Sequence, residues 1–312
     1  MDSQAKAILA PLIYYDLLDR PLTALEAYKY LRAETPEISF FNFWQKLKNS
    51  EGLLNLVEQK NGLYFLAGRP EIINTREKRL KLAQMKWKKL KAVGKYLSLV
   101  PFLRLAAVTG SLTSYNTREQ SDFDLLIILK NGRLWLGRIL LTGLIGLLRK
   151  RRHGQLTRDR ICLNCYLTEE NLKITEQAKI HDFHSAQEYG RLTPVLEIKE
   201  GTYKKFVLAN GWLAGFLKNY PWPASLGAKK IKPVLFFSWL RQIFEWLLGG
   251  TMGDWLEKIT GRWQNERINK KRRNEQPGAD QVFVSDNCLM FHPQSKGDKL
   301  MKEFDLKMSR LN

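Results

Sequence analysis

The stretch that decides the fold is LAAVTGS (residues 105–111), followed ten residues later by DFDLLIIL (residues 122–129). An apolar strand ends in Gly-Ser, and a second strand opens with two carboxylates. Because residues i and i+2 of a strand point to the same face, we expect Asp122 and Asp124 side by side and Phe123 turned into the core. Adjacent carboxylates repel unless a cation lies between them, so the pattern predicts a site for a hard ion such as Mg²⁺.

The Gly-Ser turn predicts a phosphate-binding element. Gly110 permits close backbone approach, and Ser111 is expected to begin a helix whose free N–H groups suit a phosphate. Asn116 and Arg118 are candidate helpers because of their position in the loop that follows. A phosphate-binding turn beside a pair of metal-binding carboxylates is typical of enzymes that transfer phosphoryl or nucleotidyl groups. A DxD pair also serves nucleotide-sugar glycosyltransferases as a metal site, and that alternative stays open.

The G-S-x10-D-F-D arrangement between apolar strands resembles the nucleotidyltransferase fold of the DNA polymerase β superfamily. The resemblance spans residues 90–170 of the chain. It implies that Gly110 and Ser111 contact the triphosphate of an NTP substrate and that Asp122 and Asp124 hold Mg²⁺, with Mn²⁺ as the alternative. It also implies attack of an acceptor hydroxyl on the α-phosphate, with release of pyrophosphate. RNA, a protein hydroxyl and a small molecule all remain open as the acceptor.

The superfamily usually adds a third carboxylate from a later strand, often as the general base. The matching strand here, residues 160–167, carries Asn164, which can bind a metal through its carbonyl oxygen but cannot accept a proton at neutral pH. Asp159, Glu169 and Glu170 lie at the ends of this strand, and the spacing favours none of them. Two hypotheses follow: a working Mg²⁺-dependent nucleotidyltransferase, or a catalytically degenerate protein that regulates by binding nucleotide or nucleic acid.

The charge of the chain favours an acidic partner. Its 312 residues carry a formal net charge of +20, with a pI near 9.8. Basic clusters at residues 76–95, 149–160 and 258–273 flank the motif and predict a nucleic-acid partner, although such runs are usually solvated helix faces. The three cysteines form no even disulfide set, and the N-terminus has no secretory pattern. We therefore expect a cytoplasmic location.

The longest apolar stretch, residues 134–148, is interrupted by Arg138 and is too short for a bilayer span. We expect it to form a helix packed on the sheet. A peripheral membrane contact over residues 134–152 is the less favoured interpretation.

The expected fold is α/β (α+β) in four segments. Residues 1–70 show three short helices and a hairpin, the element order of a winged helix, and residues 71–98 form a basic linker helix. Residues 99–195 are the nucleotidyltransferase core, and residues 196–312 form a helical C-terminal domain with a short terminal strand.

Several local elements are predicted within these segments. We expect helices over residues 4–18 and 24–33, and a third helix opened by Ser39. Thr23 and Glu26 are placed for a capping box. Strands are expected at residues 53–58 and 63–66 on either side of Asn61-Gly62, and another at residues 281–284.

A helix expected within residues 172–190 carries four polar side chains of metal-ligating type, His181, Asp182, His184 and Glu188. They do not fall on one helical face, so a supporting or surface role is favoured over a metal site. The tryptophans of the C-terminal third are expected to pack a core rather than to stack bases.

Overall fold

The strands that carry the Gly-Ser turn and the Asp-Phe-Asp motif lie side by side in the middle of a six-stranded sheet. This computed structural model describes residues 3–222, 230–274, 281–292 and 295–311. The strand order is β7-β4-β5-β6-β9-β8, and only β5 and β6 run parallel. The strands are β4 (Leu103–Val108), β5 (Phe123–Leu129), β6 (Ile161–Thr168), β7 (Thr193–Glu197), β8 (Gln281–Val284) and β9 (Cys288–His292).

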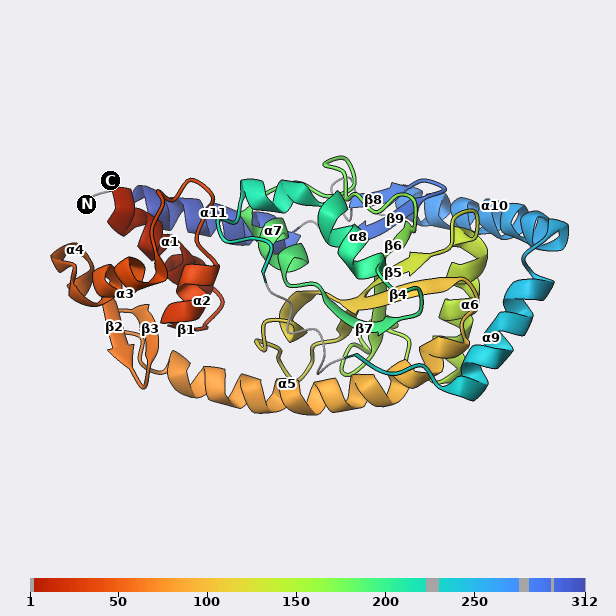
Figure 1. The fold of residues 1–312 in the computed structure, drawn as a ribbon, viewed down its shortest axis with the longest axis horizontal. Coiled ribbons are helices and arrows are strands. Elements are labelled where there is room, and N and C mark those ends of the chain that lie inside the picture. Colours follow the sequence, from red (N-terminus) through yellow and green to blue (C-terminus); the bar gives the residue numbers. More distant parts are fainter. Residues whose placement is uncertain (1–2, 223–229, 275–280, 293–294, 312) are drawn as a thin grey trace.

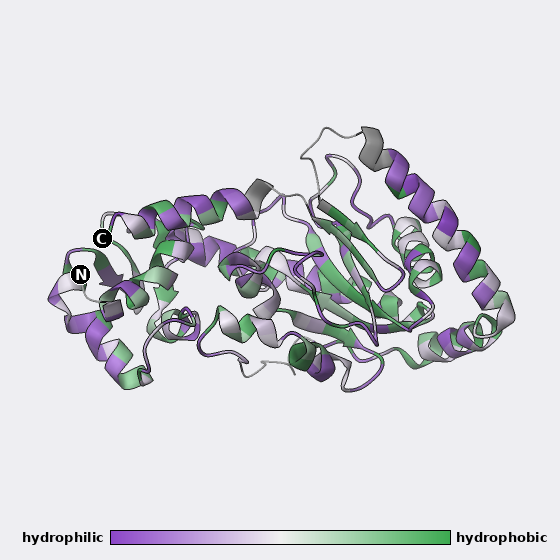
Figure 2. Ribbon diagram, turned by 90° about the horizontal axis from the view of Figure 1, so that it is seen from above, coloured by the Kyte–Doolittle hydropathy of each residue, from purple (hydrophilic) through white to green (hydrophobic). Residues whose placement is uncertain are grey.

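Strand β5 is apolar from Leu125 to Leu129 because both faces of the sheet are covered there. Leu126 and Ile128 pack toward the side of helices α1 (Ser3–Asp16), α7 (Phe183–Gly190) and α11 (Ser295–Ser309). Leu125 and Ile127 pack toward the other side, which is covered by α5 (Ile72–Gly94) and α6 (Leu134–Leu147). Figure 2 shows these central strands in the hydrophobic colour. The strict alternation puts Asp124 on the face of Leu126.

An N-terminal module, residues 3–66, has its own small sheet in the order β1-β3-β2. The Asn61-Gly62 turn forms the expected hairpin, with both residues at positive φ. Thr23 and Glu26 form the expected capping box. The other elements are β1 (Leu22–Thr23), α2 (Ala24–Lys29), α3 (Phe40–Asn49), α4 (Glu51–Leu54), β2 (Val57–Lys60) and β3 (Leu63–Leu66).

Two local expectations in this module are wrong. The helix expected over residues 24–33 ends at Lys29, where the chain turns to pack Leu31 into the core. The strand expected at residues 53–58 begins only at Val57, because the short helix α4 buries Leu53 first.

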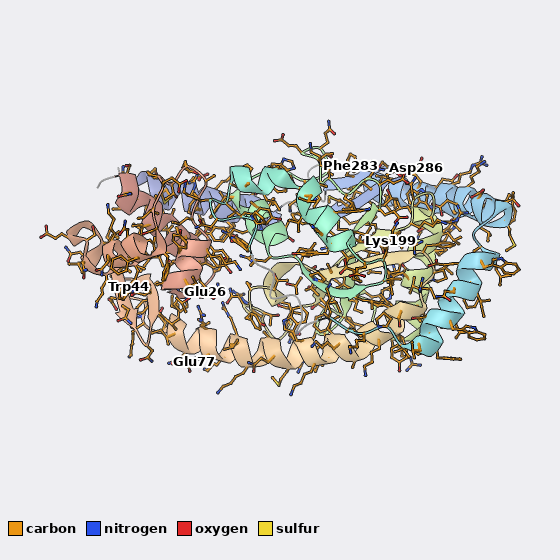
Figure 3. The ribbon with its side chains drawn as sticks, in the orientation of Figure 1. Glu26, Trp44, Glu77, Lys199, Phe283 and Asp286 are labelled. Atoms are coloured by element: carbon orange, nitrogen blue, oxygen red, sulfur yellow. The ribbon has the colours of Figure 1, made fainter. Side chains whose placement is uncertain are left out.

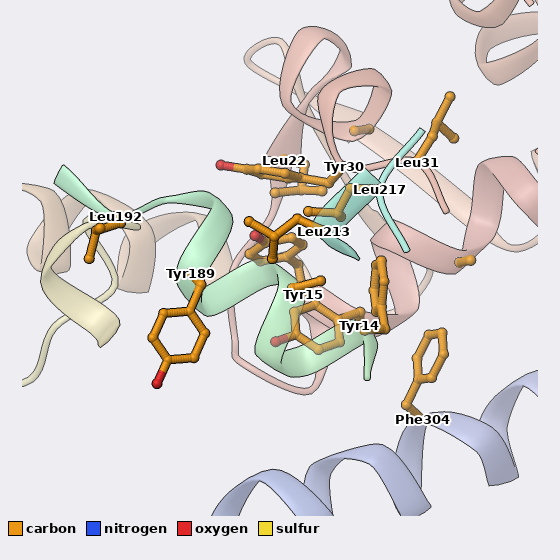
Figure 4. Packing of buried hydrophobic residues seen from close by; sticks show 14 of the residues in the cluster. Tyr14, Tyr15, Leu22, Tyr30, Leu31, Tyr189, Leu192, Leu213, Leu217 and Phe304 are labelled. Atoms are coloured by element: carbon orange, nitrogen blue, oxygen red, sulfur yellow. The ribbon is translucent and has the colours of Figure 1, made fainter. Parts of the chain in front are cut away.

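Two helices connect the module to the central sheet along opposite edges of the molecule (Figure 1). The first is α5, which leaves the module at Ile72 and is shorter than the expected helix because a 3₁₀ turn replaces it after Gly94. Glu26 fixes its start, since it forms ion pairs with Arg20 of the module and Arg76 of α5; Figure 3 labels Glu26 at this junction. The second is α11, whose Phe304 is fully buried against Tyr14 of α1 (Figure 4).

The C-terminal third does not form a separate helical domain. The predicted strand at residues 281–284 is β8, but it pairs with β9, and this hairpin extends the central sheet next to β6. Helix α10 (Thr251–Asn274) packs on α6, and α11 returns to the N-terminal module. The remaining helices are α8 (Thr202–Ala209) and α9 (Leu235–Leu247). None of the described helices combines the length and apolarity needed to cross a bilayer.

Candidate metal and nucleotide site

The two motif carboxylates lie at the start of β5 and face the same side of the sheet. Phe123 between them is 2% exposed, as the alternation predicts. Asp122 pairs with Arg152, whose Nη1 lies 2.6 Å from the carboxylate Oδ2. Burial, reinforced by the charges of Asp122 and Glu188, raises the pKa of Asp124 to about 7. The raised pKa therefore reflects mainly the burial of this carboxylate, and the two neighbouring acids add to it.

Gly110 lies directly against the second carboxylate. Its φ is +69°, and a Cβ at this position would be 2.8 Å from Oδ2 of Asp124. Only glycine allows both the backbone conformation and this close approach. The helix expected to begin at Ser111 is wrong: residues Gly110–Leu112 form a single 3₁₀ turn, closed by the Thr113 hydroxyl donating to the Gly110 carbonyl at 2.7 Å.

Replacing Gly110 with Ala is expected to destabilise the fold by about 2 kcal/mol or more, because φ strain and a steric clash add. Gly132 is the matched control: its φ is +65°, and a Cβ there would meet nothing within 4 Å. Gly132→Ala should cost only about 1 kcal/mol. Urea unfolding of both variants separates the cost of the backbone strain from the cost of the steric clash. Equal losses would contradict the close approach of Gly110 to Asp124.

Asn164 reaches the carboxylates because β6 has a bulge at this position. The register with β5 shifts between Leu125 and Leu126, which pair with Leu163 and Cys165 and leave Asn164 unpaired. Its Nδ2 donates to Oδ1 of Asp124 at 3.1 Å. Its own Oδ1 is buried and has no hydrogen-bond partner within the described part of the chain.

These residues fit a hard divalent cation. The carboxylates of Asp122 and Asp124 and the thiol of Cys162 place one potential ligand atom each within 4.8 Å of one another. Burial raises the pKa of the Cys162 thiol to about 12, so it stays protonated and is a poor ligand. The two carboxylates supply oxygen ligands, which suit Mg²⁺ or Mn²⁺, whereas Asn164 turns its Nδ2 rather than its Oδ1 to Asp124.

A cleft of about 660 Å³ opens in front of the carboxylates. The module side contributes Tyr14, Leu17 and Leu18 of α1 and the turn that follows it, and the sheet side contributes Gly110 and Ser111. Four arginines also line it: Arg79, Arg118, Arg152 and Arg191. The volume and the cations suit a phosphorylated ligand of nucleotide size.

Helix α7 adds a third carboxylate to the cleft. Glu188 lines it together with His184, and its charge contributes to the raised pKa of Asp124. The sequence marks Glu188 only as one of four polar residues on a helix, and nothing in its spacing from Asp124 indicates that the two meet. The acids proposed as substitutes lie elsewhere: Asp159 pairs with Lys86 and Lys89, and Glu169 lines a smaller hollow with Glu170.

The other members of that polar group have structural roles, as expected. His184 Nδ1 shares a 2.7 Å hydrogen bond with the Tyr14 hydroxyl, and His181 stacks on Trp212 with ring centroids 3.9 Å apart. Asp182 caps α7 by accepting from the Ser185 N–H.

The loop between the two motifs is tied by side-chain hydrogen bonds to the N-terminal module and to α5. Asn116 accepts from Arg79 at 3.0 Å and donates to the Leu18 carbonyl at 2.9 Å, so its amide fixes the loop to the module. Buried Lys86 donates to the Ser121 carbonyl at 2.7 Å, one residue before Asp122. Arg118 is 74% exposed at the mouth of the cleft.

The structure divides the basic cluster of residues 76–95 into two groups. Arg76, Arg79 and Lys86 form ion pairs within the molecule. The exposed remainder includes Lys78, Lys81 and Lys88 on the outer face of α5 and Lys95 at the start of the 3₁₀ turn that follows it. In the cluster of residues 149–160, Arg152 and Arg158 pair with acids near the cleft. Lys258, Arg262, Arg267 and Lys270 of the third cluster are exposed, and the side chains of residues 271–273 lie outside the described part.

Comparison with known proteins gives no relative for this chain: no family model, no curated protein and no solved structure matches it.

Proposed function

We propose that the protein is a Mg²⁺-dependent nucleotidyltransferase that moves a nucleoside monophosphate from an NTP to an acceptor hydroxyl. The observation that carries this proposal is the pair Asp122 and Asp124, held against a turn where only glycine fits and facing a cleft lined by arginines. When bound between the carboxylates, Mg²⁺ would neutralise charge on the triphosphate and orient it.

The side chains of the cleft can then take distinct roles. Arg152 is 42% exposed and can exchange its contact with Asp122 for a phosphate oxygen. Ser111 and the backbone at Gly110 can approach the triphosphate closely. The acceptor oxygen forms a bond to the α-phosphorus as the bond to the β-phosphate oxygen breaks, and pyrophosphate leaves. Glu188 can accept the proton from the attacking hydroxyl, a role that Asn164 cannot fill.

RNA is the acceptor to test first. The lysines on the outer face of α5 project away from the ion pairs of the molecule and fit a phosphate backbone. The assay measures pyrophosphate release with Mg²⁺, total RNA and each of the four ribonucleoside triphosphates. Release with at least one triphosphate is expected. Absence of release together with no Mg²⁺-dependent triphosphate binding by calorimetry would overturn the proposal.

The regulatory alternative has one observation in its favour, the amide of Asn164 where an acid would complete the strand site. It is distinguished by the same pair of measurements. Triphosphate binding that strengthens with Mg²⁺, without pyrophosphate release under any acceptor, would assign the protein to this second function.

Glu188→Gln is expected to lower kcat by about 10² or more and to leave KM for the triphosphate nearly unchanged, because a proton acceptor acts only in the transition state. Its test is steady-state pyrophosphate release over a range of triphosphate concentrations, which gives kcat and KM separately. Glu170→Gln, an exposed carboxylate outside the cleft, is the control. An unchanged kcat in Glu188→Gln would remove Glu188 from the reaction.

A further inference from the structure

Helices α9 and α10 expose an unusual concentration of large apolar side chains. All four exposed tryptophans of the described residues lie here, and Trp246 is 80% exposed. We call the set the apolar edge: Leu235, Phe236, Trp239, Phe244, Trp246, Leu247, Met252, Trp255, Ile259 and Trp263. Figure 1 places the two helices at the end of the molecule opposite the N-terminal module. Exposed apolar patches of this kind mark interaction sites.

On α9, the two charged residues are turned inward, and large apolar side chains are left outside. Arg241 is buried and donates to Glu245 at 2.9 Å. Glu245 also accepts from the backbone N–H of Phe102 at 2.8 Å, so both charges are used to fix the helix on the protein. Phe236 and Trp239, one turn apart, are left on the outside with their rings stacked. The exposed face of α9 therefore carries no compensating charge of its own.

Helix α10 also exposes large apolar side chains. Its inner face is made of Gly261, whose Cβ would lie 2.9 Å from Trp135, and of Gln264, which donates to the Trp135 carbonyl at 2.9 Å. Its outer residues recur at helical spacing, namely Met252, Trp255, Ile259 and Trp263. A soluble helix normally buries its apolar stripe; α9 presents the reverse of this pattern, and α10 exposes an apolar stripe beside charged residues.

The charges beside the apolar edge are mainly positive. Asp254 pairs with Arg133 at 2.7 Å, and Glu257 accepts from two backbone N–H groups at the start of α6. Exposed cations follow along α10, namely Lys258, Arg262, Arg267 and Lys270, and Glu266 is the exposed acid among them. We propose that the apolar edge docks on a membrane surface that contains anionic lipids, with the tryptophans at headgroup depth and the cations against lipid phosphates.

This occupant fits the edge better than the other candidates. A second copy would bring two surfaces of the same sign together, each from a chain of net charge +20. A nucleic acid can stack on tryptophan but has no use for aliphatic groups such as Leu235, Leu247 and Ile259. The edge also differs from the stretch 134–152: α6 lies between the sheet and α10, and its Leu141 and Ile145 are fully buried.

The test is co-sedimentation with vesicles of phosphatidylcholine and phosphatidylglycerol in equal parts, compared with pure phosphatidylcholine. The wild-type protein should bind the anionic vesicles, with a blue shift of its tryptophan emission, and bind more weakly at high salt. Trp239→Ser with Trp246→Ser should lower the partition coefficient by about tenfold or more. Phe41→Ser with Leu208→Ser, two exposed apolar residues outside the edge, should leave it unchanged.

Three results would overturn the proposal. One is the absence of wild-type binding to anionic vesicles, and another is equal binding by the tryptophan variant and the wild type. The third is a wild-type dimer in sedimentation velocity that the tryptophan variant loses, which would assign the edge to a second copy. Circular dichroism of each variant keeps unfolding apart from loss of binding. The measurement does not depend on enzymatic activity, so it stands or falls separately from the proposed function.

Discussion

The double substitution Asp122→Asn and Asp124→Asn is expected to reduce Mg²⁺-dependent pyrophosphate release by about 10³ or more. Asn keeps the shape of each side chain and one acceptor oxygen but removes both negative charges from the cation site. A loss of about 4 kcal/mol of transition-state stabilisation corresponds to this factor. The measurement is pyrophosphate release at saturating triphosphate, and full retained activity would refute the proposed site.

Stability measurements provide the control, because Asp124→Asn is expected to increase the stability of the fold while it lowers activity. The pKa of Asp124 is raised from 3.8 to about 7 in the folded protein, mainly by burial. The folded state thus binds more protons than the unfolded state between about pH 4 and pH 7, and stability falls as the pH rises through this window. Asp124→Asn removes that penalty, on the order of a few kcal/mol.

Thermal unfolding in the presence of a chelator should therefore show a higher Tm for Asp124→Asn than for the wild type at pH 8, and a smaller difference at pH 4. A variant that is inactive and also less stable at pH 8 would mean that Asp124 serves the fold rather than a cation.

Phe304→Ala is expected to destabilise the protein by about 3–5 kcal/mol. Its ring is 0% exposed and stacks on Phe183 with centroids 5.8 Å apart, and it meets the edge of Tyr14 at 6.1 Å. These contacts join α11 to both α7 and α1, so the cavity would open where the module meets the helix that carries Glu188. Chemical unfolding measures the loss.

Leu306→Ala is the matched control on the same helix, since Leu306 is 54% exposed. It should change the free energy of unfolding by no more than about 0.5 kcal/mol. A loss in Phe304→Ala as small as that of the control would show that α11 is only loosely attached to the module.

Local patterns predict much of this molecule. The alternation of β5 places Asp122, Asp124 and Phe123 on the faces that they occupy, because burial of both sheet faces leaves no freedom of register. The Asn61-Gly62 turn and the Thr23 capping box are likewise set by residues at most a few positions apart. In each case a single physical rule acts within one element.

The rest of the site depends on contacts between residues far apart in the sequence, which local patterns do not predict. Tyr14 and His184 share a hydrogen bond across 170 positions of sequence, and that packing brings Glu188 to the cleft. The bulge that turns Asn164 toward Asp124 leaves no mark in the alternation of β6. The C-terminal hairpin shows the same difference. The residues of β8 predict that strand, but the pairing of β9 with β6 joins residues far apart in the sequence and cannot be predicted from local patterns.

The packing of α11 on α1 also determines when the cleft can form during synthesis of the chain. Tyr14 leaves the ribosome before its partner Phe304, which follows some 290 positions later. At the usual pace of translation that interval lasts roughly 15–60 s. Until it ends, α1 lacks the packing of Phe304 against Tyr14, so the core of the N-terminal module is completed only after α11 has been made. A chain released before α11 would carry the Gly-Ser and Asp-Phe-Asp strands without a finished cleft.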